Sequence, residues 1–252
     1  MTLAPPALAG GVHADAVAPL LLPEDLRLSP EQFAAVCAAN PQAVLELSAE
    51  GQLIHITPTG GETGARNSTL LVLLGLAVRT CGLPLKLFDS STGFRLPDGS
   101  VFSPDASLLR QERWETLSPQ ERRGFPPLCP DLVVELASAS DEGPRSLTAL
   151  RQKMATYQTN GAQLGWLLIP YLQAVEIWRA AGQGEPQTIN SAKQLQQQAR
   201  SSRACCWSWT GSGTSEAFPP ALFQAALEPL QSRPIAAISA SAESMPSAPA
   251  CR

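Results

Sequence analysis

Two kinds of hydrophobic pattern alternate along the chain: short runs of period two and longer runs with a helical period. In PDLVVELAS, at 130–138, Val133 and Glu135 fall on one face of a strand and their apolar neighbours fall on the other. In STLLVLLGLAVRTCG the leucines recur at the three- and four-residue spacing of a helix. We therefore predict a helix over about 62–81, ended by Gly82.

The other elements follow from the same periods and from the turn residues between them. Ser29-Pro30-Glu31 is typical of a helix start, with a capping serine, a proline in the first turn and an acidic residue after it. SLTALRQKMATYQTNG also has a helical period. The predicted strands are VLEL and QLIHIT, which form a hairpin, and then LKLF, TGFRL, DASLL, PDLVVELAS, LGWLLI and AVEIWRA. This order predicts a layered α/β (α+β) architecture.

The two ends of the chain lack these patterns. Residues 1–28 are rich in Ala, Pro and Leu without sustained periodicity, and they predict a mostly disordered leader. Residues 182–252 begin polar and end in an Ala-, Ser- and Pro-rich stretch, which predicts a weakly ordered, low-complexity tail. We therefore predict one folded domain, at 29–181.

The charge balance limits how this protein can contact nucleic acid. The net charge is −4 and the sequence pI is about 5.3, whereas a non-specific nucleic-acid binder normally has a basic surface. Any such contact therefore needs a local basic patch, a divalent metal that offsets the carboxylates, or both.

The cysteines, histidines and apolar runs argue against several other classes of protein. The six cysteines include no C-x-x-C pair and there are only two histidines, which argues against a structural zinc site. The N-terminus lacks the basic region of a signal peptide, and the longest apolar run, at 70–78, is too short to span a bilayer. We expect a cytoplasmic protein without a membrane partner.

Two carboxylates occupy unusual positions in predicted strands. Asp105 follows Pro104 at the start of DASLL, and Glu135 lies inside the apolar run VVEL. A buried charge is costly unless it is paired or bound to a metal, and two such groups on adjacent strands can share a hard cation such as Mg²⁺. The alternative is that both make only structural contacts. Asp131 shares a strand face with Glu135. We expect Asp131 to lie at the end of the strand, where water or a turn hydrogen bond satisfies its carboxylate.

Four blocks in the same order carry a resemblance to a known family. They are TPTGGETGARN, SSTGFRLPDGSVFSPDASLL, PDLVVELASASD and the K-M-x-x-Y-x-x-N-G-A-Q-L-G-W-L-L stretch that follows. Over about residues 30–180 the chain resembles the Uma-two family of restriction endonuclease-like proteins. The resemblance implies the PD-(D/E)xK nuclease fold, a mixed sheet flanked by helices.

The resemblance also implies roles for four residues. Asp105 matches the acidic residue of the family's Pro-Asp element and is the expected primary metal ligand, and Glu135 is the expected second ligand. Glu62 matches a helix carboxylate that binds a second metal or orients water. Ala137 stands where the basic motif has lysine, and Lys153 on the following helix takes that place. Its spacing puts Lys153 on one helix face with Tyr157.

The implied activity is the hydrolysis of phosphodiester bonds in DNA with Mg²⁺, for which Mn²⁺ is a substitute. Arg66 and Arg95 are candidate phosphate contacts. Two alternatives stay open: a catalytically degenerate member that binds nucleic acid or a partner without cleavage, and a structural protein whose carboxylates make only salt bridges. A homodimer is compatible with cutting both strands, but the sequence does not establish one.

Overall fold

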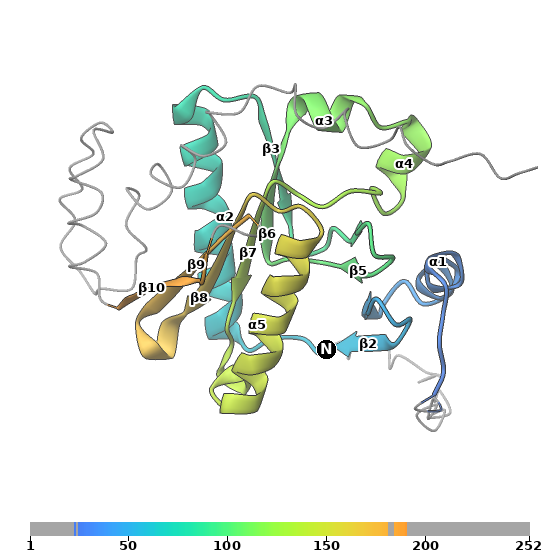
Figure 1. The fold of residues 1–252 in the computed structure, drawn as a ribbon, viewed down its shortest axis with the longest axis horizontal. Coiled ribbons are helices and arrows are strands. Elements are labelled where there is room, and N and C mark those ends of the chain that lie inside the picture. The colour runs from blue at the N-terminus through green and yellow to red at the C-terminus, as the bar shows by residue number, and fades with distance from the viewer. Residues whose placement is uncertain (1–22, 24, 181–183, 191–252) are drawn as a thin grey trace, which may run out of the picture.

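The computed structural model describes residue 23 and residues 25–180 and 184–190, which form two β-sheets with helices around them (Figure 1). Along the chain the helices are α1 (Pro30–Ala39), α2 (Gly61–Cys81), α3 (Gln111–Glu115), α4 (Pro119–Arg123) and α5 (Pro144–Thr159). The strands are β1 (Val44–Leu47), β2 (Leu53–Ile56), β3 (Leu85–Asp89), β4 (Phe94–Arg95), β5 (Val101–Phe102), β6 (Ala106–Arg110), β7 (Leu132–Leu136), β8 (Leu164–Ile169), β9 (Ala174–Arg179) and β10 (Gln187–Asn190). The predicted α/β class is confirmed.

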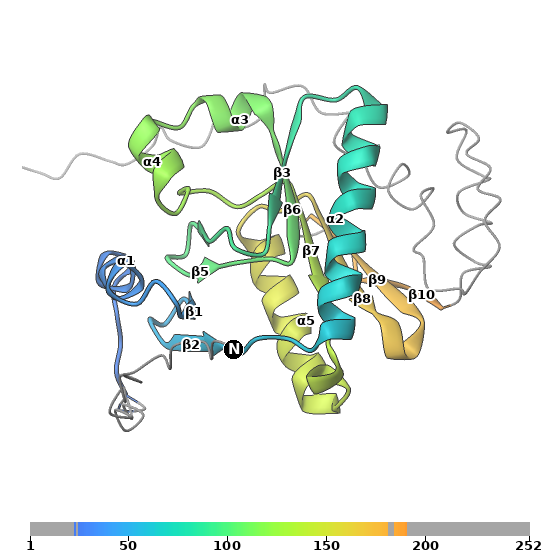
Figure 2. The same ribbon diagram turned by 180° about the vertical axis from the view of Figure 1, so that it is seen from behind.

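The larger sheet has six strands in the order β10-β9-β8-β7-β6-β3. Strands β7 and β8 are parallel, and α5 is the crossover between them, while the other neighbouring pairs are antiparallel. The sheet is therefore mixed. Seen from both sides, α2 and α5 run along the sheet, with α3 and α4 beyond one end of it (Figures 1 and 2).

The alternation in β7 explains why one helix covers each face of this sheet. Leu132, Val134 and Leu136 belong to one buried cluster, which also contains residues of α2 such as Leu74. Val133 belongs to a second cluster, whose other members include several residues of α5. Because side chains alternate across a strand, the second face is the one toward which Glu135 points.

The smaller sheet, in the order β2-β1-β5-β4, packs with α1 around a separate small core. The predicted hairpin is present, since β1 and β2 pair antiparallel from Val44↔Ile56 to Leu47↔Leu53. Ser29 caps α1 as the sequence predicts, because its hydroxyl accepts a hydrogen bond from the backbone N–H of Gln32. The phenyl ring of Phe33 joins α1 to the sheet.

The described residues end beyond the predicted domain boundary. Gln187–Asn190, assigned above to the tail, form β10, which pairs antiparallel with β9 and buries Ile189 against the larger sheet. The short QTIN run carries a single apolar residue, so its pattern is too weak to predict a strand. Most of the predicted leader and tail lies outside the described residues. Among the described helices, none combines the length and apolar character that crossing a membrane requires.

Candidate active site

The two strand carboxylates lie at the same place in the sheet. Asp105 directly precedes β6, whose first residue, Ala106, pairs with Val134 of β7. Its Oδ2 atom accepts a hydrogen bond of 2.8 Å from the backbone N–H of Leu136. The antiparallel register therefore brings Asp105 beside Glu135, on adjacent strands.

Helix α5 brings two further groups to Glu135. The Nζ atom of Lys153 lies 2.9 Å from Glu135 Oε1, and the hydroxyl of Tyr157 donates to the same oxygen at 3.0 Å. The two residues stand one turn apart on the helix face that meets the sheet. The rings of Phe102 and Tyr157 flank the ammonium group, at 5.5 and 5.9 Å from Nζ to the ring centroids. Lys153, which lies far from Glu135 in sequence, is therefore within the site.

One more ionisable residue contacts this cluster, and the sequence analysis did not select it as a site residue. Glu46, in the middle of β1, is 3% exposed, and its Oε1 atom lies 2.9 Å from the Nζ of Lys153. The same oxygen accepts a 2.8 Å hydrogen bond from the backbone N–H of Ser103. The signal that singled out Glu135, a carboxylate inside a short apolar strand, is also present in VLEL.

Burial and mutual repulsion shift the pKa values of these groups. Burial raises the pKa of Glu135 to about 8, and Asp105 and Glu46 add to the effect while Lys153 opposes it. Burial likewise raises the pKa of Asp105, against its hydrogen bond from Leu136. For Lys153, burial alone would lower the pKa, but attraction to Glu135 and Glu46 outweighs burial and holds the pKa above its ordinary value.

The upward shifts of the two carboxylates begin with burial and are strengthened by the negative charge gathered around a single ammonium group. With every group ionised, three carboxylates would face one lysine in a poorly hydrated place. Protons or a bound cation would relieve that repulsion.

The donor set fits a hard cation at the Asp105–Glu135 pair. The contacts within the protein use Asp105 Oδ2 and Glu135 Oε1. Among the described residues, no hydrogen bond is made to Asp105 Oδ1 or Glu135 Oε2. Mg²⁺ commonly binds through one or two carboxylates and keeps several waters, so these two oxygens suit it.

Among the described residues, Glu62 makes no hydrogen bond or ion pair with Asp105 or Glu135. It lies in the first turn of α2, its side chain is 74% exposed, and its Oε1 atom forms a 2.6 Å ion pair with Arg66 one turn later. Helix α2 packs against the face of the sheet opposite to the one that carries Glu135. Over the described part of the chain, no three His, Cys, Asp or Glu side chains are arranged to hold one metal ion. The role of Glu62 stays a prediction.

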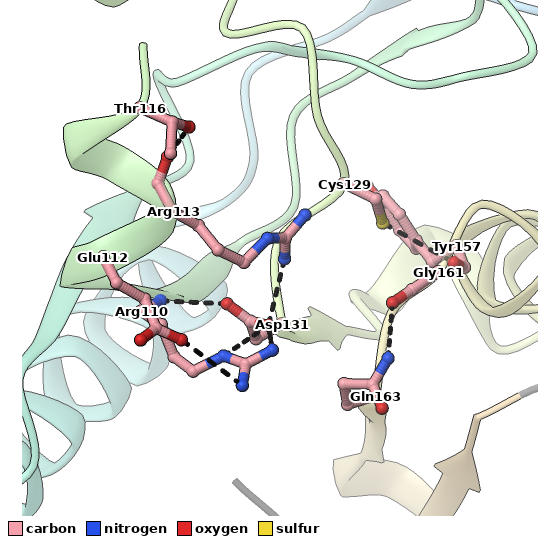
Figure 3. A network of polar contacts seen from close by, with 9 residues as sticks. All are labelled: Arg110, Glu112, Arg113, Thr116, Cys129, Asp131, Tyr157, Gly161 and Gln163. Carbon is pink, nitrogen blue, oxygen red and sulfur yellow. Dashed lines mark hydrogen bonds and ion pairs between the residues drawn. The ribbon is translucent and has the colours of Figure 1, made fainter. Parts of the chain in front are cut away.

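The expectation that water or a turn hydrogen bond satisfies Asp131 is wrong. Asp131 is fully buried rather than hydrated at the end of the strand, because two arginines enclose its carboxylate (Figure 3). Oδ2 accepts the backbone N–H of Arg110 at 2.9 Å. Oδ1 lies 3.0 Å from Nη2 of Arg110 and 2.9 Å from Nη1 of Arg113. Asp131 therefore joins β7 to α3 as a structural ion-pair residue.

Two more arginines form ion pairs with glutamates. Arg95, a candidate phosphate contact, lies 3.2 Å from Glu31 at the surface. On α5, the Nε of Arg151 donates to Oε1 of Glu176 in β9 at 2.9 Å. Glu176 is as buried as Glu46, yet among the described residues it makes no hydrogen bond or ion pair with Asp105 or Glu135, so this pair offers a matched comparison.

The fold and the Asp–Glu–Lys arrangement define a class, the restriction endonuclease-like proteins. A solved structure with this architecture is titled "Crystal structure of a putative nuclease belonging to DUF820", from Anabaena variabilis ATCC 29413. It is 21% identical to this chain with a TM-score of 0.51, and the match covers 65% of this chain and 85% of that one. The curated proteins contain no match.

Residues 30–205 match the Uma2 family, described as "Putative restriction endonuclease", so the chain belongs to that family. The resemblance found from the four sequence blocks is thereby confirmed.

Proposed function

We propose that this protein is a metal-dependent endonuclease that hydrolyses phosphodiester bonds in DNA. The observation that carries the proposal is the meeting of Asp105, which directly precedes β6, with Glu135 of β7 and Lys153 of α5. Two carboxylates with oxygens free for a cation, beside a charged lysine, are suited to metal-assisted phosphodiester hydrolysis. Membership of the Uma2 family supports the nuclease assignment.

Each residue has a distinct task in this proposal. Asp105 and Glu135 would hold Mg²⁺, or Mn²⁺ in its place, through Oδ1 and Oε2. When bound, the ion supplies Lewis-acid polarisation of the phosphate and a lower pKa for a coordinated water. Lys153, held charged by its carboxylate neighbours, would stabilise the negative charge that develops on the phosphate oxygens. Tyr157 fixes the Glu135 carboxylate by donating to Oε1.

The hydrogen bonds of the pair also orient it before substrate arrives. The Leu136 N–H fixes one oxygen of Asp105, and Lys153 with Tyr157 fixes one oxygen of Glu135. Ligands whose orientation is set in advance lose little freedom when a cation binds. Each carboxylate would keep its other oxygen for the cation.

A plasmid-nicking assay with the full chain tests the proposal. Asp105→Asn and Glu135→Gln keep the side-chain shape and remove the charge, and we expect each to lower Mg²⁺-dependent cleavage at least about a hundredfold. Glu176→Gln removes a similarly buried carboxylate, which pairs with Arg151 on α5, the helix that also carries Lys153. We expect this variant to cleave like the wild type. Cleavage that survives Glu135→Gln in a clean preparation would sink the assignment.

Calorimetry with Mg²⁺ or Mn²⁺ distinguishes the alternatives. Binding that depends on Asp105 and Glu135, without cleavage of either DNA or RNA, would indicate a degenerate nuclease that only binds. No binding that depends on these carboxylates would indicate a purely structural pair. Cleavage of RNA in preference to DNA would redirect the proposal to a ribonuclease.

A further inference from the structure

We infer that Glu46 is a positioning residue that holds the ammonium group of Lys153 at the Asp105–Glu135 pair. The expected effect of Glu46 on cleavage rests on the proposed function. The position of the Lys153 ammonium group does not depend on that function.

The first argument is the way Lys153 is bound. Its Nζ lies 2.9 Å from an oxygen of Glu135 and 2.9 Å from an oxygen of Glu46, so it bridges the two sheets. A lysine side chain is a flexible stem that ends in a compact charge, and one partner leaves it free to pivot. A second carboxylate, on a different element, fixes its position.

The second argument is the way Glu46 itself is fixed. Its Oε1 accepts from the backbone N–H of Ser103, which lies two residues before Asp105. Glu46 therefore contacts both the lysine and the segment that leads to the first carboxylate. β1 itself pairs with β5, whose last residue directly precedes Ser103. The small sheet thus connects Lys153 to the segment that leads to Asp105.

The third argument is the cost of placing this carboxylate there. Glu46 is almost fully buried in a short strand of otherwise apolar residues, and it shares the ammonium group of Lys153 with a second buried carboxylate, that of Glu135. For stability alone, an apolar residue at this position would serve as well or better. The arrangement is explained if the charge is used to hold Lys153.

Arg151 and Glu176 show what a purely structural pair on the same helix looks like. Glu176 pairs with Arg151, whose side chain is 45% exposed, whereas the side chain of Lys153 is 16% exposed and its ammonium group lies beside two aromatic rings. Breaking either pair removes one buried carboxylate charge that a residue of α5 neutralises. Only loss of Glu46 is expected to change the site.

The first experiment observes the lysine directly and needs no cleavage. The chain has only three lysines, Lys86, Lys153 and Lys193, so the ammonium signals in a ¹H–¹⁵N NMR spectrum are few. We expect a slowly exchanging signal from Lys153, identified by its loss in Lys153→Met. Glu46→Gln should abolish or broaden this signal, while Glu176→Gln should leave it in place.

The second experiment measures cleavage. Glu46→Gln is expected to lower kcat about 10- to 100-fold with KM within about twofold, as found when a residue that orients a catalytic group is lost. In a Lys153→Met background, Glu46→Gln should have no further effect, because Glu46 acts through the lysine. Glu46→Asp, which keeps the charge, should retain the lysine signal and cleave faster than Glu46→Gln.

Three results would overturn the inference. The first is a Lys153 signal that persists unchanged in Glu46→Gln, and the second is independent, additive losses in the double variant. The third is that Glu46→Asp, which keeps the charge, behaves like Glu46→Gln in both experiments. Glu46→Asp also keeps the inference testable if Glu46→Gln folds poorly. If the wild type cleaves no nucleic acid, the proposed function fails, and the NMR result alone then decides the position of the lysine.

Discussion

The buried carboxylate of Asp131 makes the sharpest stability prediction. Asp131→Asn keeps the size of the side chain and removes the charge that Arg110 and Arg113 share. In the wild type, Oδ1 of Asp131 lies within 3.1 Å of Nε and Nη2 of Arg110 and Nη1 of Arg113. The substitution leaves two guanidinium groups facing a neutral amide that carries donors of its own.

The magnitude follows from burial. Removing one partner of a buried ion pair costs about 3–5 kcal/mol. Arg110 and Arg113 keep side-chain exposures of 19% and 29%, so water compensates part of the loss and we expect about 2–3 kcal/mol. In a folded unit of this size each kcal/mol lowers Tm by about 2–4 °C, which gives a decrease of roughly 5–10 °C.

Thermal unfolding followed by circular dichroism measures this decrease. The control is Glu31→Gln, because Glu31 also pairs with an arginine but its side chain is 74% exposed. We expect Tm of the control to match the wild type within error. If Asp131→Asn lowers Tm no more than Glu31→Gln does, the ion-pair cluster does not stabilise the fold and the reasoning is refuted.

Three further predictions concern the site and its support. Because burial, Asp105 and Glu46 raise the pKa of Glu135 to about 8, we expect the metal-free protein to carry a proton there at pH 7 and Mg²⁺ binding to release it. The affinity should therefore rise as pH increases toward about 8, and the calorimetric heat should differ between buffers of unlike ionisation enthalpy; equal heats would contradict the prediction. Gly165→Ala should destabilise the fold by about 1–2 kcal/mol, because an added Cβ would clash with the buried end of the Met154 side chain on α5. Denaturant unfolding measures this loss, and an unchanged unfolding midpoint would show that α5 moves to make room. Glu62→Gln should lower cleavage at least about tenfold without changing Tm, if the family role of this exposed residue applies; cleavage at the wild-type rate would remove Glu62 from the site.

Local features of the structure were predictable because their causes are local. The Ser29 cap, the extent of α2 and the alternation in β7 depend on residues within a few positions of one another. The strand carboxylates were visible for the same reason, since a charge inside an apolar run is a local anomaly. Gly82 adopts a left-handed conformation, with φ of 67°, where the pattern predicts the end of a helix.

Lys153 was predictable only in part. Its pattern on α5 does not distinguish it from a solvated surface lysine, and only the resemblance to Uma2 proteins implied a catalytic place for it. The structure brings its ammonium group to Glu135. Its role in cleavage remains a prediction that the variants above test.

The sequence by itself determined the α/β class, the main helices and strands, and the pair Asp105 and Glu135 as candidate metal ligands. Only the tertiary structure decided that Glu46 contacts Lys153, 107 residues away, and Ser103, 57 residues away. It likewise decided that Asp131 is buried between two arginines. The physical reason is that periodicity reports which face of an element is buried, whereas charge pairing across elements depends on how strands and helices meet. The site is therefore a two-carboxylate centre whose lysine is held by a third acidic residue that the sequence did not single out.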